Sequence, residues 1–204
     1  MKKALTPSSE NFYDKIKEIL ESARNRSYMA VNFEMVQAYW NIGRSIVEEE
    51  QAGRERAEYG KYLLSNLSIR LTAEYGKGFD YRNLAYMRQF YQTFPNMNAL
   101  RSELSWTHYR ILIRVDREQA RQFYLQECVE GNWSTRQLER QINSLYFERI
   151  LMSSKKGRPL VKKEADGKKE VMQPGHIIKD PYVLEFLNLN PYDTPLFSTT
   201  GIGY

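Results

Sequence analysis

Apolar residues recur every three or four positions along most of residues 10–150, which is the pattern of amphipathic helices rather than of strands. Seven such stretches follow one another, and glycine, proline or a capping residue separates most of them. They span residues 12–23, 29–47, 60–75, 81–94, 106–115, 116–131 and 134–149. In the first stretch, Phe12, Ile16, Ile19 and Ala23 share one helix face. The pattern predicts an all-α fold, with one multi-helix domain over residues 10–150.

Capping residues predict where several of these helices begin. Asp80 and Ser105 each precede an apolar stretch, and a side-chain oxygen at such a position can accept hydrogen bonds from the first free amides. Two further pairs have the spacing of a capping box: Ser134 with Gln137, and Asp116 with Gln119. We therefore expect helices to start directly after these four residues, and the fourth helix to end before Pro95.

The composition changes near residue 153. Residues 157–204 hold five of the seven prolines and five of the eleven glycines, which predicts an irregular tail over residues 151–204. Within it, Asp166 and Gly167 suggest the turn of a short hairpin between residues 159–163 and 169–173. Residues 181–187 are predicted to form one short helix.

Charge and residue counts exclude several classes of protein. The chain carries a net charge of +5, and residues 153–179 hold eight basic and three acidic residues. Such clusters either attract phosphate backbones or are only solvated surface. One cysteine and two histidines rule out an intramolecular disulfide and a zinc finger. No apolar run is long enough for a membrane span or a signal peptide, so we expect a cytoplasmic protein with no membrane partner.

Residues 59–94 have the layout of a helix-turn-helix, of the plain or the winged kind, with Gly76 and Gly78 at the turn. The second helix would be the recognition helix. Its outer face carries side chains suited to DNA bases: Arg82, Asn83, Tyr86 and Gln89. Three more residues are candidates for phosphate contacts: Arg70, Lys77 and Arg88. The alternative is a helical hairpin that only packs.

A second arrangement of this type spans residues 105–148. The last helix would turn Leu138, Ile142 and Leu145 inward and present Arg136 and Arg140 as further DNA contacts. Four arginines add charge upstream: Arg110, Arg114, Arg117 and Arg121. The alternative is a packed helical layer or a dimer surface. A dimer surface would make the protein a homo-oligomer.

The sequence offers no catalytic constellation. His108 and His176 have no evident partner, and Cys128 lies beside Glu127 and Glu130 without a cation that would lower its pKa. There is no glycine-rich phosphate loop. The one Asp-x-Lys match, at residues 166–168, lies in a polar lysine-rich loop rather than after a buried strand. We predict no catalytic residue, no metal ligand and no cofactor.

Several unusual strings resemble the N-terminal domain of the YhcG-like bacterial proteins, over about residues 10–190. They are YWNIGR at 39–44, GKGF at 76–79, MRQFY at 87–91, LSWTHY at 104–109, WSTRQLERQI at 133–142 and KDPYVLEFL at 179–187. The resemblance implies a helical, DNA-binding domain that is normally followed by a PD-(D/E)XK nuclease domain. The acidic residue and the lysine of such nucleases have no counterpart here, so we expect no enzymatic activity from this chain.

Two functions follow as hypotheses. In the first, the chain is the DNA-binding, targeting domain of a YhcG-like nuclease without its catalytic domain, and its partner is duplex or branched DNA. In the second, it is a protein-interaction or dimerisation module that recruits a separate nuclease or restriction-system subunit. Salt dependence separates them, because phosphate contacts weaken steeply with salt and apolar contacts do not.

Overall fold

A computed structural model describes residues 7–52, 59–154, 157–167, 170, 172 and 180–187. Within these ranges the fold is all-α, as predicted, and no strand occurs. Two 3-10 turns are η1 (Lys77–Phe79) and η2 (Met97–Ala99). The α-helices are α1 (Pro7–Ala52), α2 (Tyr59–Tyr75), α3 (Tyr81–Thr93), α4 (Trp106–Leu112), α5 (Glu118–Gly131), α6 (Thr135–Asn143), α7 (Tyr146–Met152), α8 (Arg158–Asp166) and α9 (Pro181–Phe186).

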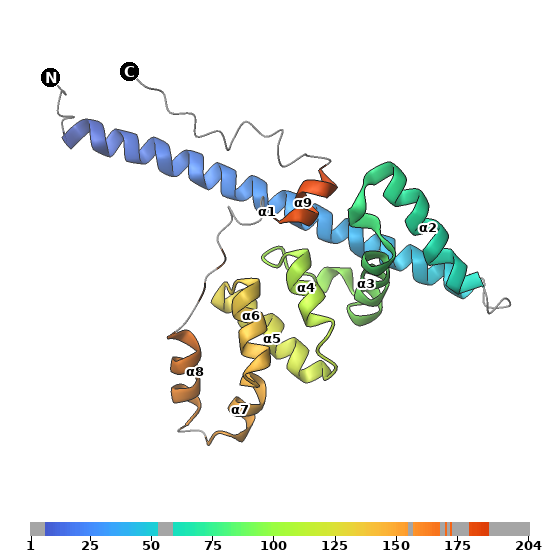
Figure 1. Cartoon of the computed structure of the whole chain (residues 1–204). Helices are drawn as coiled ribbons and strands as arrows, with labels where there is room; N and C mark the ends of the chain where they lie inside the picture. The colour runs from blue at the N-terminus through green and yellow to red at the C-terminus, as the bar shows by residue number, and fades with distance from the viewer. Residues whose placement is uncertain are drawn as a thin grey trace.

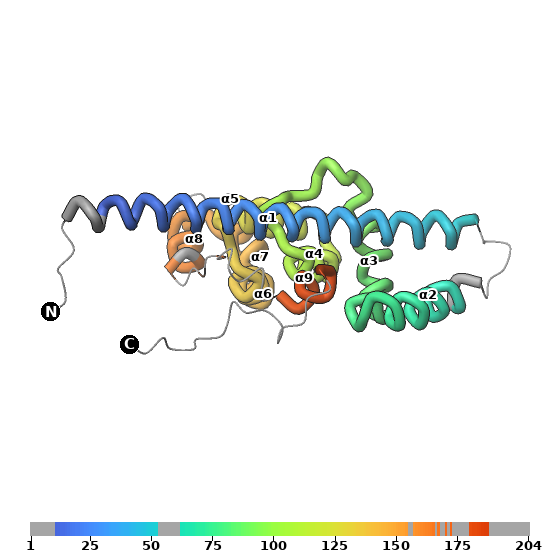
Figure 2. The backbone as a smooth tube through the Cα atoms, turned by 90° about the horizontal axis from the view of Figure 1, so that it is seen from above, coloured from blue at the N-terminus to red at the C-terminus, as the bar shows by residue number. Residues whose placement is uncertain are grey.

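The first two predicted helices are one continuous helix. α1 has 46 residues and is about 69 Å long at about 1.5 Å per residue. The prediction of a break between Ala23 and Met29 was wrong, because that stretch contains neither glycine nor proline and nothing in it ends a helix. Figures 1 and 2 show the C-terminal half of α1 lying across the other helices while its first turns extend beyond them.

The main core forms where α1 crosses α3. Met35, Val36 and Tyr39 of α1 pack against Leu84 and Met87 of α3, and all five side chains are fully buried. Gly43 lies at the crossing itself. A Cβ there would lie 2.0 Å from the carbonyl oxygen of Met87, so glycine is what lets the two backbones approach this closely.

Aromatic rings connect this crossing to α4. The ring centroids of Tyr39 and Trp106 lie 5.1 Å apart, and those of Phe90 and Tyr109 lie 4.7 Å apart. Trp40 donates its indole N–H to the carbonyl of Phe94, at 2.7 Å. Burying rings of this size supplies a large share of the apolar stabilisation of a core.

Most predicted helix starts are confirmed. Asp80 accepts a hydrogen bond from the Asn83 amide at 2.7 Å, and Ser134 accepts one from the Gln137 amide at 3.1 Å. Ser105 forms a capping box in which His108 takes the place usually held by Glu or Gln. The Asp116 cap was wrong. The N-cap of α5 is Arg117, which makes no side-chain capping bond.

The helix predicted over residues 134–149 is two helices. Leu145 has φ 53°, in the left-handed region, and this residue separates α6 from α7. The break lets both Tyr146 and Phe147 turn toward Phe123, with ring centroids 5.5 and 5.3 Å away. Leu145 itself is exposed, so its predicted inward orientation was wrong.

The region after residue 150 contains two of the helices. Residues 159–163 lie in α8, so the predicted hairpin was wrong; residues 168, 169, 171 and 173 lie outside the described ranges. The amide of Met172 instead donates to the carbonyl of Asn132 at 2.9 Å. The predicted helix over 181–187 is confirmed as α9, which packs against α1 and η1. The domain boundary near 150 stays a prediction.

Candidate nucleic-acid interface

Three arginines converge on one tyrosine at the outer side of α3 and α4. Tyr86 and Arg82 come from α3, Arg110 comes from α4, and Arg114 comes from the turn that directly follows α4. The guanidinium carbons of Arg82, Arg110 and Arg114 lie 5.9, 4.6 and 5.5 Å from the Tyr86 ring centroid. Tyr182 of α9 completes the group, with its ring centroid 5.0 Å from the Arg110 guanidinium carbon. We call these five residues the arginine–tyrosine cluster.

Hydrogen bonds, in addition to the contacts with the rings, hold the cluster together. Arg114 donates to the Tyr86 hydroxyl at 3.1 Å, and Arg110 donates to the Tyr182 hydroxyl. The bond from Arg114, supported by Arg82 and Arg110, lowers the pKa of Tyr86 to about 8. A phenol whose pKa is lowered by nearby cations reports a strongly positive local potential.

No carboxylate forms an ion pair with these arginines within the part of the chain that the structure describes. The ion pairs found there are all elsewhere, and none involves Arg82, Arg110 or Arg114. Three like charges held close together repel one another unless an anion is bound between or beside them.

A small mixed cavity of about 290 Å³ borders the cluster. Its positive side consists of Lys77, Arg82 and Arg110, and its negative side of Asp80 and Glu185. Burial raises the pKa of Glu185, and the nearby charge of Asp80 raises it further. The cavity therefore combines cationic groups from η1, α3 and α4 with two carboxylates, and the pKa of one of these carboxylates is raised.

The structure brings some of the sequence-predicted residues together and places others in different roles. Arg82 and Tyr86 belong to the cluster, and Lys77 lines the cavity beside it. Asn83 is buried and does not face outward as predicted. Its amide donates to the carbonyl of Gly78 and accepts from the indole N–H of Trp106 at 3.1 Å.

The remaining predicted residues are dispersed. Arg88 forms an ion pair with Glu50 of α1 at 2.8 Å, and Gln89 donates to the carbonyl of Ile113 at 3.3 Å. Arg70 is exposed on α2. On α6, Arg136 is highly exposed, 3.8 Å from Glu170, and Arg140 donates to Gln137. The helix-turn-helix geometry predicted over residues 59–94 is not confirmed.

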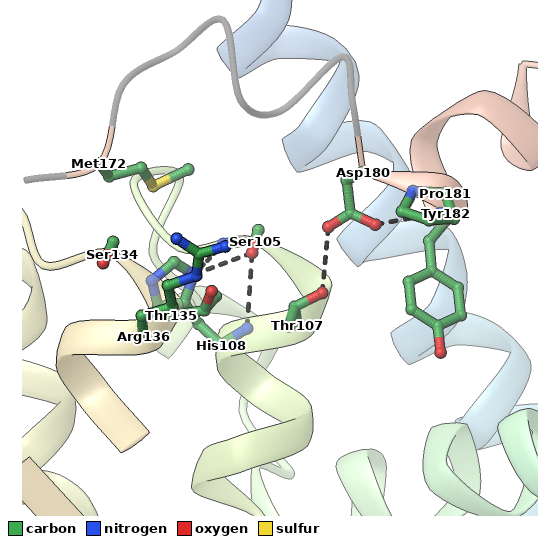
Figure 3. Close-up of a pocket in the computed structure, with 10 residues that line it drawn as sticks. All are labelled: Ser105, Thr107, His108, Ser134, Thr135, Arg136, Met172, Asp180, Pro181 and Tyr182. Atoms are coloured by element: carbon green, nitrogen blue, oxygen red, sulfur yellow. Dashed lines mark hydrogen bonds between the residues drawn. The ribbon is translucent and has the colours of Figure 1, made fainter. Parts of the chain in front are cut away.

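A second cavity, of about 420 Å³, lies where the first turns of α4, α6 and α9 meet. Figure 3 shows Ser105, His108 and Arg136 on one side of it and Asp180 and Tyr182 on the other. Asp180 caps α9 and accepts from the Thr107 hydroxyl at 3.0 Å, and burial raises its pKa. Tyr182 borders both cavities, so the start of α9 separates Arg136 from the arginine–tyrosine cluster.

His108 has a structural role in this second cavity. It is 1% exposed, its Nδ1 lies 2.8 Å from the Ser105 hydroxyl, and its Nε2 lies 3.0 Å from the Trp133 carbonyl oxygen. Burial lowers its pKa to about 4, so the ring is neutral at physiological pH. The imidazole therefore links the start of α4 to the loop before α6.

Cysteine, histidine and carboxylate side chains are the other groups with catalytic or metal-binding potential among the described residues. Cys128 is buried, and burial raises its pKa well above that of a free thiol, so it is inert as a nucleophile. Across the described ranges, no group of three acidic, cysteine or histidine side chains is arranged to hold a metal ion. In the same part of the chain, no helix combines the length and apolar character that crossing a bilayer requires.

Sequence reasoning did not connect Arg110 and Arg114 with Tyr86. It treated them as diffuse upstream charge, although their spacing of four residues within the helix predicted over residues 106–115 would place both on one face. That spacing was the available signal. It could not reveal that this face lies against α3, because the pairing of α3 with α4 is set by the buried residues Phe90, Trp106 and Tyr109.

Comparisons with known proteins agree on one family. The DUF1016 N-terminal domain matches residues 15–149. "Putative nuclease YhcG" of Escherichia coli (strain K12) is 34% identical over 216 residues, which cover 90% of this chain and 57% of that protein. The chain thus spans little more than half the length of this curated relative, and no solved structure matches it. The chain belongs to the DUF1016 N-terminal domain family and is homologous to the N-terminal part of YhcG.

Proposed function

We propose that this domain binds the phosphate backbone of DNA through the arginine–tyrosine cluster and so directs the nuclease activity of longer family members to DNA. The observation that carries the proposal is the convergence of Arg82, Arg110 and Arg114 on Tyr86 without an ion-paired carboxylate among the described residues. A phosphate diester supplies the missing negative charge. Guanidinium groups match phosphate oxygens in geometry and bind them with charge-assisted hydrogen bonds.

The surroundings of the cluster favour an extended polyanion over a small anion. Lys77 lies on one side of the first turn of α9, and Arg136 lies on the other side, where it is almost fully exposed. A phosphate backbone that crosses this turn would meet cationic groups before, at and after the cluster. The relative that carries the name of a nuclease adds support, because a nuclease acts on such a backbone.

Binding of the full chain to labelled duplex and branched DNA, measured by fluorescence anisotropy over a range of salt concentrations, tests the proposal. We expect affinity to fall steeply with salt. In the Arg82→Ala/Arg114→Ala variant, which leaves the Arg110–Tyr182 bond intact, we expect about 10- to 100-fold weaker binding. The salt slope should also become shallower, by about one unit for each phosphate group that the variant no longer binds.

The matched control is Lys17→Ala/Arg24→Ala, which removes the same charge from the projecting part of α1. It should bind within about twofold of the unmodified chain if the cluster, and not net charge alone, carries the binding. Equal losses of affinity in the two variants would reduce the interaction to non-specific attraction. Absence of binding at low salt would refute the proposal.

The lowered pKa of Tyr86 gives the binding a pH dependence. As pH rises through about 8, the phenol loses its proton and its negative charge partly neutralises the arginines. DNA affinity at constant salt should therefore fall between about pH 7 and about pH 9, below the ordinary tyrosine pKa of about 10. Tyr86→Phe keeps the ring and removes the proton, so its affinity should be flat over this range. An equally steep decline in Tyr86→Phe would assign the effect to another group.

A second candidate function, protein binding, is supported by an apolar cavity of about 480 Å³ between α1 and α2. Its lining includes Ile42, Ile46, Leu63, Leu67 and Leu71. A pocket of this character suits an apolar side chain of a nuclease or restriction-system subunit. Binding through it would change little with salt, in contrast to binding through the cluster.

A further inference from the structure

The N-terminal part of α1 carries an apolar surface that no described element covers. Residues 11–22 are all exposed, and Figure 1 shows this part of the helix extending away from the others. Five large apolar side chains lie on it, each between 41% and 67% exposed: Phe12, Tyr13, Ile16, Ile19 and Leu20. A patch of this size on a soluble domain marks an interaction site.

The side chains follow a heptad pattern. Phe12, Ile16, Ile19 and Ala23 are spaced by four, three and four residues, and Tyr13 and Leu20 border this seam seven residues apart. Charged residues occupy the opposite side of the helix, where Lys17 and Glu21 form an ion pair at 3.9 Å. Such a narrow apolar stripe with a charged back is typical of a helix that pairs with one other helix.

Pairing would also stabilise the helix itself. Residues 11–27 are exposed apart from the half-buried Ala23, and helices without tertiary contacts are only marginally stable in water. Burial of the stripe against a partner supplies the contacts that this segment lacks.

We infer that the stripe pairs with the same stripe of a second copy of the chain, in antiparallel orientation about a two-fold axis between Lys17 and Glu18. In this register Phe12 faces Ala23 of the second copy, so a large side chain meets a small one. Ile16 faces Ile19 of the second copy across the axis. Every exposed apolar side chain of the segment then has a partner, because Tyr13 also meets Leu20 of the second copy.

Charge complementarity and the available apolar area favour a second copy of the chain as the partner of this helix. The register brings Lys15, which borders the seam, toward Glu18 of the second copy, a residue of opposite charge. A parallel pair would instead place Phe12 against Phe12 of the second copy and Lys15 beside Leu20 of the second copy. At about 200 Å² per large side chain, of which between 41% and 67% is exposed, the five side chains offer about 600 Å² per chain. Two chains together offer about 1,200 Å², which is the lower end for a stable interface.

Size-exclusion chromatography with light scattering on the full chain tests the inference. We expect twice the 24.2 kDa chain mass at high concentration, dissociating on dilution. Ile16→Glu/Ile19→Glu places charges in the centre of the seam and should raise the dimer Kd about a hundredfold or more. The control Asp14→Lys changes charge on the opposite side of the helix and should leave the dimer intact.

Cysteine cross-linking tests orientation and serves as a second measurement where a seam variant folds poorly. Phe12→Cys chains mixed with Ala23→Cys chains should form a disulfide, whereas each variant alone should not; the native Cys128 is buried and does not interfere. A monomer at all concentrations overturns the inference, as does a dimer that survives Ile16→Glu/Ile19→Glu. Cross-linking of each variant with itself also overturns it, because that result requires a parallel pair. DNA affinity enters none of these readouts, so their failure is separate from failure of the proposed function.

Discussion

Gly43→Ala is expected to lower the stability of the protein by about 3 kcal/mol, because the added methyl group collides with backbone. A Cβ at residue 43 would lie 2.0 Å from the Met87 carbonyl oxygen and 2.7 Å from its carbonyl carbon. Neither atom can rotate away as a side chain would, so α1 and α3 must separate. Thermal unfolding followed by circular dichroism should show a decrease of about 6–12 °C in Tm.

The sign of this effect is informative in itself. In a helix without close packing, Gly→Ala stabilises by up to about 1 kcal/mol, so a raised Tm would contradict the close crossing of α1 and α3. Gly167→Ala is the matched control. It lies at the end of α8, where a Cβ would make ordinary contacts at 3.4 and 3.6 Å, and its Tm should change by about 2 °C or less.

Asn83→Ala is expected to destabilise the fold by about 2–4 kcal/mol while leaving DNA affinity per folded molecule unchanged. The amide of Asn83 satisfies the Trp106 indole N–H and the Gly78 carbonyl, and all of these groups are buried. Removal of the amide leaves both without a partner. Urea unfolding and anisotropy, measured on the same preparation, separate the two effects.

Gln92→Ala provides the comparison, since it removes another amide from α3 at an exposed position. It should change stability by no more than about 0.5 kcal/mol. If Asn83→Ala kept full stability but abolished DNA binding, Asn83 would be a DNA contact and the structural role assigned to it would be wrong.

The sequence predicted the helical class, the caps at Asp80, Ser105 and Ser134 and the short helix at Pro181, because each of these depends on local interactions within one turn. The sequence-based predictions failed where tertiary packing determines the local conformation. The stretch around Asn25 carries no helix-ending signal, yet two apolar stripes on slightly different faces suggested two helices. The left-handed conformation of Leu145 goes with tertiary packing, because the rings of Tyr146 and Phe147 directly after it both contact Phe123.

The residues of the candidate site could also be found from the sequence only where a local sequence pattern, and not tertiary packing, determines their positions. Arg82 and Tyr86 were identified because they lie one turn apart on the outer side of a helix. Asn83 was misassigned because helical spacing alone does not distinguish a polar residue that faces solvent from one that is buried. The side chain of Asn83 is buried and accepts a hydrogen bond from the indole N–H of Trp106. The contribution of α4 depends on which helix packs against α3, and no pattern within α4 encodes that contact.

The docking of α9 has a consequence for protein architecture. Because α9 packs against α1 and η1, and Tyr182 of α9 binds Arg110, whatever follows Leu187 in the sequence begins within six residues of the arginine–tyrosine cluster. Anything tethered there by a short flexible segment reaches a local concentration of about millimolar at the cluster. About ten extended residues span about 33 Å, which is close to one turn of B-form DNA. The length of that tether would therefore determine how many base pairs separate the bound phosphate from the point at which an attached domain acts.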